Sequence, residues 1–119
     1  MIERYSRKEI RNIWEDYNKY SIWLDIELAA AEAMEKLKII PKGVVKAVRS
    51  KARININRIL QIENKVKHDI IAFLTSITEK AGKEARYLHK GMTSSDVLDT
   101  CFNLQLKQSG EILLKDISQ

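Results

Sequence analysis

Residues 89–96 combine a histidine, a glycine and three adjacent hydroxyl residues just before a strongly helical segment. The first N–H groups of a helix have no partner within the helix and lie at the positive end of its dipole. A helix beginning at Thr93 or Ser94 would therefore offer oriented donors to a carboxylate or a phosphate, with His89 close by. Thr93 and Asp96 also have the spacing of a capping box, so a purely structural role explains the same residues.

A second polar cluster lies at Lys67, His68 and Asp69. An imidazole at a helix start can hydrogen-bond an anionic substrate or move a proton near neutral pH. Asp69 could orient the ring if the backbone turns there. The alternative is that His68 is simply a polar residue at a helix cap.

Arg4 and Tyr5, near the amino terminus, offer a cation and an aromatic ring that suit a phosphate and a base or sugar. Residues so close to a terminus are often disordered. Metal chemistry is not expected, because two histidines about 21 residues apart and the single Cys101 have no recognised ligand spacing. No glycine-rich phosphate loop is present. We therefore expect no metal and no cofactor.

The composition predicts one soluble domain over residues 1–119. Charged residues make up 31% and hydrophobic residues 45% of the chain. Only 4 Gly and 1 Pro interrupt it, which favours long helices. No apolar run reaches the roughly 20 residues of a membrane span, and no secretory signal is recognisable. The lone cysteine fits a reducing compartment, so we predict a cytoplasmic protein without membrane contact.

The elements that must position these clusters are all predicted to be helical, because apolar residues recur at three- and four-residue intervals and no strand alternation persists. A short helix should follow Ser6, which has Glu9 at capping-box spacing. Along the long helix, an apolar stripe is formed by Ile22, Ile26, Ala29, Ala33 and Leu37 and is widened by Trp23, Leu28 and Ala31. Residues 29–33 of this stripe are expected to form a face for a partner helix. The remaining expected segments are helices over 15–38, 43–53, about 57–66, 69–81 and 93–119, with a loop over 83–92.

Two surface features suggest partners. The last helix carries more apolar positions than a small domain can cover, which indicates an interface. Residues 36–67 hold 10 Lys/Arg and 1 Asp/Glu, a net charge of +9. A solvated helical face explains that charge, and a surface for nucleotide or nucleic acid is the alternative. We do not expect nucleic acid as a partner, since residues 36–67 contain no aromatic residue for base stacking.

Residues 1–7, 67–73 and 89–100, with Asn57, Arg58 and Glu63 between them, resemble the adenylosuccinate lyase family of the fumarase/aspartase superfamily. The similarity runs along essentially the whole chain. It implies an all-α fold in which residues 93–119 begin a long helix of a central bundle. It also implies elimination of fumarate from adenylosuccinate, which leaves AMP, and from the succinyl-carboxamide intermediate of purine biosynthesis.

The resemblance assigns the three polar clusters to one substrate site. The family pattern implies that Arg4 and Tyr5 contact the nucleotide, that Lys67, His68, Asp69 and His89 line the pocket, and that Thr93 and Ser94 hold the fumaryl portion. His68 would assist proton transfer or anchor the substrate.

This sequence departs from the family in two ways. Lys67 stands where the family usually has arginine, and a lysine lacks the bidentate fork. The family's principal acid histidine and its mobile-loop serine lie downstream of these 119 residues. The family site is built from several subunits of a homotetramer. We therefore expect the 119-residue chain to be catalytically inactive by itself.

Overall fold

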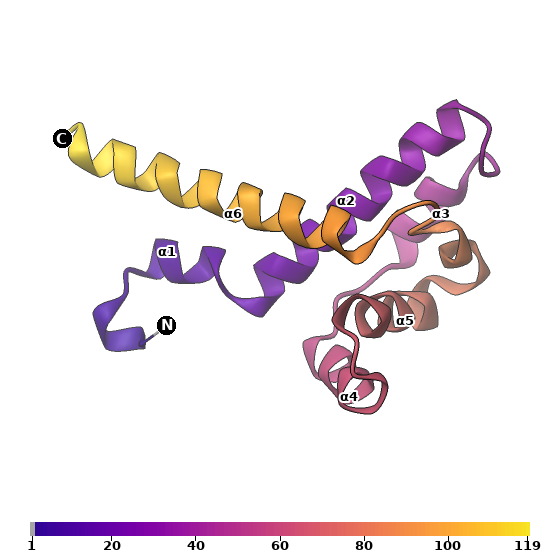
Figure 1. Ribbon diagram of the computed structural model, residues 1–119, viewed down its shortest axis with the longest axis horizontal. Helices are drawn as coiled ribbons and strands as arrows, with labels where there is room; N and C mark the ends of the chain where they lie inside the picture. The colour runs from indigo at the N-terminus through magenta and orange to yellow at the C-terminus, as the bar shows by residue number, and fades with distance from the viewer. Residues whose placement is uncertain (1) are drawn as a thin grey trace.

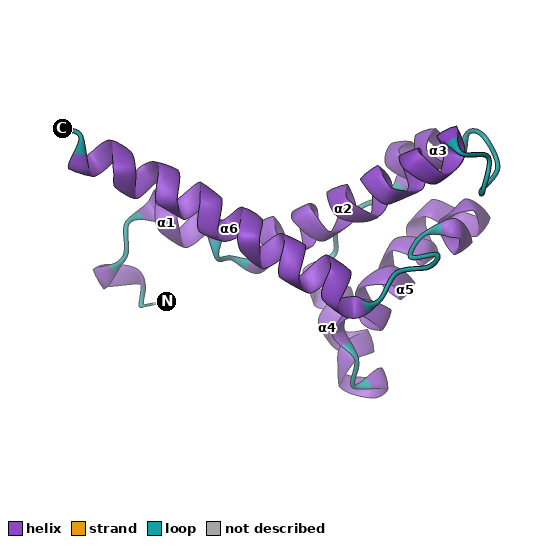
Figure 2. Ribbon diagram, turned by 45° about the horizontal axis from the view of Figure 1, so that its top comes forward, coloured by secondary structure: helices purple, strands orange, loops and turns teal. Residues whose placement is uncertain are grey.

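The computed structural model describes residues 2–119, which form helices joined by short connections and contain no strand (Figures 1 and 2). The described part of the chain measures 49 × 34 × 24 Å. None of its helices is both long enough and apolar enough to cross a membrane. The elements are the 3₁₀ helix η1 (Glu3–Tyr5), α1 (Lys8–Ile13), α2 (Asp16–Lys36), α3 (Val44–Lys51), α4 (Ile56–Val66), α5 (Asp69–Ala81), the 3₁₀ helix η2 (Gly82–Tyr87) and α6 (Ser94–Ile117).

The core is centred on three aromatic rings from α2 and α5. The Phe73 ring stacks on Tyr20 at 5.9 Å between centroids and meets Trp23 edge-on at 5.4 Å. All three side chains are almost completely buried. Aromatic groups of this size supply much of the apolar area that a small domain buries, so this cluster holds α5 against the amino-terminal half of α2.

Helices α3, α4 and α5 fold into one end of the molecule, and their limits follow from local signals in the sequence. Asn55 caps α4 by accepting a hydrogen bond from the Arg58 amide at 3.0 Å. Gly82 ends α5 with φ +79°, a conformation that glycine adopts without steric cost. Val48 and Ile59 are fully buried. The predicted helices in this region are confirmed.

The long helix α6 crosses α2 and continues to the other end of the molecule, where it lies beside α1 (Figure 1). Polar side chains join α6 to α1 and its carboxyl-terminal cap. The buried Gln105 amide donates to the Ile13 carbonyl at 2.9 Å, and the Trp14 indole donates to the Ser109 hydroxyl at 3.1 Å. Arg7 also forms an ion pair with Asp116. The amino-terminal helix is therefore held by residues about 90 to 110 positions later in the chain.

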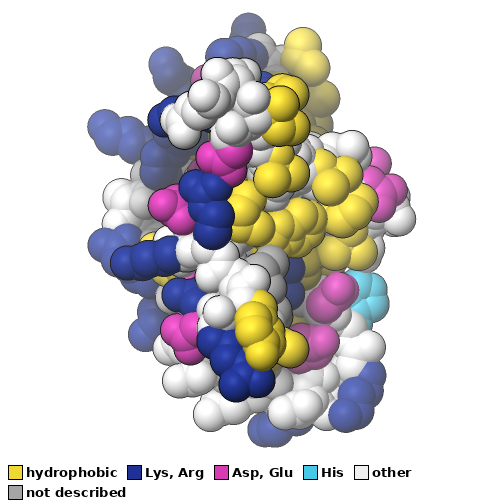
Figure 3. Space-filling model, turned by 90° about the vertical axis from the view of Figure 1, so that its left-hand side faces the viewer, with side chains coloured by type: hydrophobic (Ala, Val, Ile, Leu, Met, Phe, Trp, Pro, Cys, Tyr) yellow, Lys and Arg dark blue, Asp and Glu magenta, His cyan; other side chains and the backbone are white. Residues whose placement is uncertain are grey.

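The face of α6 that these contacts do not use remains apolar and open. Figure 3 looks at the end of the molecule where both termini lie, and shows hydrophobic side chains gathered in a band with Lys and Arg side chains along its edge. The exposed hydrophobic side chains of α6 are Phe102, Leu104, Leu106, Leu113, Leu114 and Ile117. The predicted excess of apolar positions on the last helix is thus confirmed.

Two predictions about local structure are wrong. Ser6 does not cap α1, because its hydroxyl donates back to the Glu3 carbonyl at 3.1 Å and Arg7 takes the cap position. The segment predicted as a loop over 83–92 contains the 3₁₀ helix η2. On α2, the predicted stripe is buried at Trp23, Leu28 and Ala31 and exposed at Ala29, Ala33 and Leu37.

Candidate active site

The α4–α5 junction presents Lys67, His68 and Asp69 on a sharp turn. Lys67 ends α4 in the left-handed conformation, with φ +55°. His68 caps α5, because its Nδ1 accepts a hydrogen bond from the Ile71 amide at 3.3 Å. Asp69 lies 3.7 Å from the same nitrogen but accepts from the Ile70 amide instead. The start of α5, rather than Asp69, therefore sets the direction of the His68 ring.

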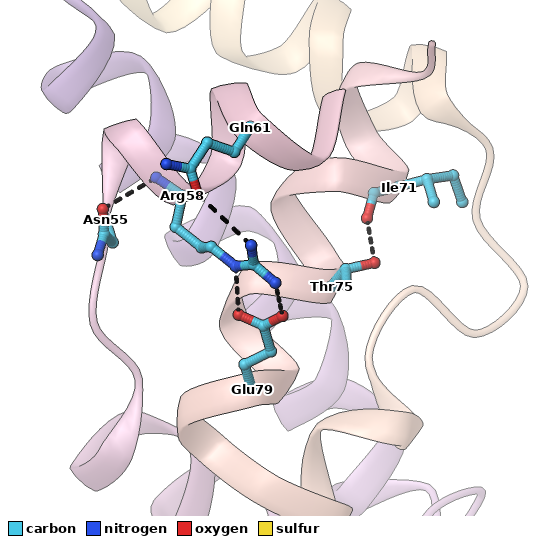
Figure 4. Close-up of polar contacts among 6 residues, drawn as sticks. All are labelled: Asn55, Arg58, Gln61, Ile71, Thr75 and Glu79. Atoms are coloured by element: carbon cyan, nitrogen blue, oxygen red, sulfur yellow. Dashed lines mark hydrogen bonds and ion pairs between the residues drawn. The ribbon is translucent and has the colours of Figure 1, made fainter. Parts of the chain in front are cut away.

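An ion pair between Arg58 of α4 and Glu79 of α5 clamps the two helices that form this junction (Figure 4). The guanidinium donates to both carboxylate oxygens, at 2.9 and 2.6 Å. These hydrogen bonds are the main cause that lowers the pKa of Glu79, and they raise the pKa of Arg58. A bidentate pair fixes direction as well as distance. It therefore holds the start of α4 against the end of α5, at the ends of the two helices remote from the turn at residues 67–69.

His89 is held by two hydrogen bonds to the side chain of Glu27, a residue of α2. Its Nδ1 lies 2.6 Å from Glu27 Oε1, and its backbone amide donates to Oε2 at 2.8 Å. The Glu27 side chain has no exposed surface, whereas the His89 side chain keeps 19% of its exposure. Sequence reasoning missed Glu27. The available signal was a charged residue between apolar neighbours on the buried face of α2.

The α6 amino terminus begins as the sequence predicts. Thr93 occupies the cap position, and the Asp96 carboxylate accepts a hydrogen bond from the Thr93 amide at 2.8 Å. Ser94 is the first residue of the helix, is half-buried, and makes no side-chain hydrogen bond within residues 2–119. The unpartnered first-turn amides and this hydroxyl are therefore available to an anion.

Arg4 and Tyr5 lie in η1, where the guanidinium sits over the Tyr5 ring at 4.7 Å. Both side chains are exposed, and the Tyr5 residue keeps 74% of its surface. Figure 1 places η1 at one end of the molecule, remote from α4, α5 and the start of α6. Within one chain, then, Arg4 and Tyr5 do not meet the other clusters.

Within residues 2–119, five surface pockets are lined entirely by residues other than the eight predicted site residues. Lys67, His68 and Thr93 are exposed, while Asp69, His89 and Ser94 are half-buried. Residues 2–119 also contain no group of three or more His, Cys, Asp or Glu side chains placed to hold a metal ion.

Comparison with known proteins gives consistent matches. The family described as "Lyase" matches residues 3–119. An adenylosuccinate lyase of Bacillus subtilis (strain 168) is 47% identical over 119 residues, which is 100% of this chain and 28% of that protein. An adenylosuccinate lyase of Staphylococcus saprophyticus is 44% identical over the same shares. The chain thus spans about 28% of the length of these relatives and matches their amino-terminal part.

A solved structure shares the fold. The crystal structure of a fumarate lyase from Mesorhizobium sp. BNC1 superposes with a TM-score of 0.86 at 22% identity, over 95% of this chain and 27% of that chain. The predicted all-α lyase-type fold is confirmed by this match and by the helices described above.

Proposed function

The chain belongs to the lyase family, and from that premise we propose that it serves as the amino-terminal segment of an adenylosuccinate lyase. The observation that carries the proposal is 44–47% identity along the whole chain to two adenylosuccinate lyases. The reactions are the release of fumarate from adenylosuccinate, which leaves AMP, and the matching elimination from the succinyl-carboxamide intermediate of purine biosynthesis. The alternative of a non-catalytic basic binding module is not favoured by this match.

The proposed reaction determines what the site must supply. A base removes a proton from the carbon beside a carboxylate, and negative charge builds up on that carboxylate. The C–N bond then breaks, its electron pair leaves with the nitrogen, and an acid protonates that nitrogen. Donors fixed in advance around the developing charge contribute most to such a reaction.

Helix α6 would supply donors for this charge. The first-turn amides point out of the helix start, the Ser94 hydroxyl has no hydrogen-bond partner within residues 2–119, and Thr93 is held in place by Asp96. They would bind the carboxylate of the fumaryl portion and stabilise the doubly charged state.

The other clusters would bind the rest of the substrate. His68 is oriented by α5 and keeps its second ring nitrogen for the substrate, with Lys67 and Asp69 on either side. His89 would line the same pocket, and Arg4 and Tyr5 would bind the nucleotide. The principal acid and base would come from outside these residues.

The exposure of these side chains supports a site completed by other chains. We propose a homotetramer in the cytoplasm, assembled through the apolar face of α6, which would form the first part of a central helical bundle. The distance between η1 and the other clusters in Figure 1 is then bridged by having different subunits contribute to one site. Residues 1–119 would form one helical unit of that assembly.

Fumarate release tests the proposal. The full-length protein that carries this segment should convert adenylosuccinate to AMP and fumarate, followed by ultraviolet absorbance. The 119-residue chain alone should show no turnover. A full-length protein that folds but leaves adenylosuccinate intact contradicts the proposal, and turnover by the 119-residue chain contradicts the shared site.

The salt dependence of nucleic-acid binding tests the alternative function, a non-catalytic basic binding module. A basic binding module would bind RNA or DNA with an affinity that falls steeply as salt rises, and His68→Ala would not change that binding. We expect no such binding at physiological salt.

A further inference from the structure

We propose that Glu27 is a positioning residue for His89, and that its buried carboxylate selects the imidazole tautomer with the proton on Nδ1. In that tautomer Nε2 is an acceptor, free to receive a hydrogen bond from the substrate or from a partner side chain. This inference rests on the proposed function, in which His89 lines the substrate pocket.

The two hydrogen bonds define the proton's position. The His89 backbone amide can only donate, and it uses Glu27 Oε2 at 2.8 Å. The other oxygen, Oε1, lies 2.6 Å from Nδ1. A carboxylate only accepts hydrogen bonds, so the ring nitrogen facing it must carry the proton. Second partners of this kind set the tautomer of functional histidines.

The surroundings of Glu27 show that the contact is specific. Its side chain is fully buried in the middle of α2. Within residues 2–119 it makes no hydrogen bond or ion pair except those to His89. A buried carboxylate is costly unless its oxygens accept hydrogen bonds, and both Glu27 oxygens have their partners on His89, so the two residues depend on each other.

The backbone of His89 supports the same conclusion. His89 has φ +62°, a left-handed conformation that a non-glycine residue adopts at a cost and that persists only where its surroundings enforce it. The bond from the His89 amide to Glu27 stabilises this conformation. Glu27 therefore holds both the turn and the ring, and Nε2 has no partner within residues 2–119.

The second histidine of the chain provides an internal control. His68 Nδ1 accepts from the Ile71 amide, so the neutral His68 ring must carry its proton on Nε2. The two histidines are therefore expected in opposite tautomers. Long-range ¹H–¹⁵N correlation spectra of the 119-residue chain, recorded at about pH 8 where ordinary imidazoles are neutral, distinguish these two states directly.

The Glu27→Gln variant tests whether the Glu27 carboxylate sets the His89 tautomer or only fills space in the core. The glutamine has the same shape, and its carbonyl oxygen must face the His89 backbone amide because that amide only donates. Its NH₂ group then faces Nδ1, which must become an acceptor. We expect His89 to switch to the Nε2-protonated tautomer in Glu27→Gln while His68 stays unchanged. A His89 that keeps its tautomer in this variant overturns the proposal.

Turnover tests the functional consequence, with Glu27→Asp as the matched variant. Asp keeps an acceptor but is shorter, whereas Gln keeps the length but reverses the hydrogen bond. In the full-length protein we expect Glu27→Gln to lower kcat for fumarate release by about 10- to 100-fold, the loss seen for partners that orient metal-bound histidines. Glu27→Asp should retain more turnover.

Two results overturn the role in catalysis: normal kcat in a Glu27→Gln protein whose tautomer has switched, or lower kcat in Asp than in Gln at equal helical content. Absence of fumarate release from the wild-type protein would instead refute the proposed function, and the tautomer measurement would still stand. The two failures are therefore distinguishable.

Discussion

Replacing Ser94 with alanine tests whether the start of α6 is a binding site or only a helix cap. The Ser94 hydroxyl makes no hydrogen bond within residues 2–119, and Thr93 rather than Ser94 occupies the cap position. Ser94→Ala should therefore change the free energy of unfolding by less than about 0.5 kcal/mol. If the hydroxyl donates to the developing carboxylate charge, kcat of the full-length protein should fall by about 10²- to 10³-fold, or about 2.7–4 kcal/mol.

Thr93→Ala is the matched control for stability. It removes the cap side chain and should cost about 1 kcal/mol, which lowers Tm by about 4 °C for a domain of this size. Fumarate release would be measured on both variants of the full-length protein, and thermal unfolding on both variants of the 119-residue chain. Normal turnover in Ser94→Ala refutes the assignment of the hydroxyl to the site. A Tm loss in Ser94→Ala as large as that in Thr93→Ala would show that it acts through the helix.

Three further predictions concern stability and reactivity. Phe73→Ala opens the fully buried aromatic cluster and should cost about 3–5 kcal/mol in a denaturant titration; a loss below 1 kcal/mol, to order of magnitude, contradicts that packing. Arg58 lowers the pKa of Glu79, so the pair stabilises the fold above the ordinary glutamate pKa and loses this effect as pH falls through the lowered value. The stability advantage of wild type over Glu79→Gln should shrink between about pH 6 and pH 3, and an advantage independent of pH excludes the pair. Burial raises the pKa of the Cys101 thiol, so alkylation should be slow in the native chain and fast in denaturant; equal rates would place Cys101 at the surface.

Local sequence signals predicted most of the helices, because their caps and stops act within a few residues. Asn55 starts α4, Gly82 ends α5, and Thr93 starts α6, each by a contact that the adjacent sequence already contains. Ser6 misled the prediction because a hydroxyl can bond to the preceding turn as well as to the next helix, and here it bonds to Glu3.

Tertiary contacts decided what the sequence could not. The apolar residues of α2 fit several adjacent stripes along the helix. Trp23 and Tyr20 pack against Phe73 of α5, so the stripe that contains them is buried, and Ala29 and Ala33 remain exposed. Glu27 was missed for the same reason: its partner lies 62 residues away, and no local pattern reveals that a carboxylate is buried. The polar clusters at His68 and Thr93 could be found by type and spacing, and we propose that other chains complete the site to which they belong.

The pairing of α1 with α6 bears on how the chain folds during synthesis. Ile13 and Trp14 are hydrogen-bonded to Gln105 and Ser109. Helix α1 therefore cannot form these contacts until residues up to about 109 have left the ribosome. Its own six residues are too few to form a stable helix in isolation. Although α1 precedes α2 to α6 along the chain, it is therefore expected to be among the last of these helices to dock, and such long-range closure slows folding.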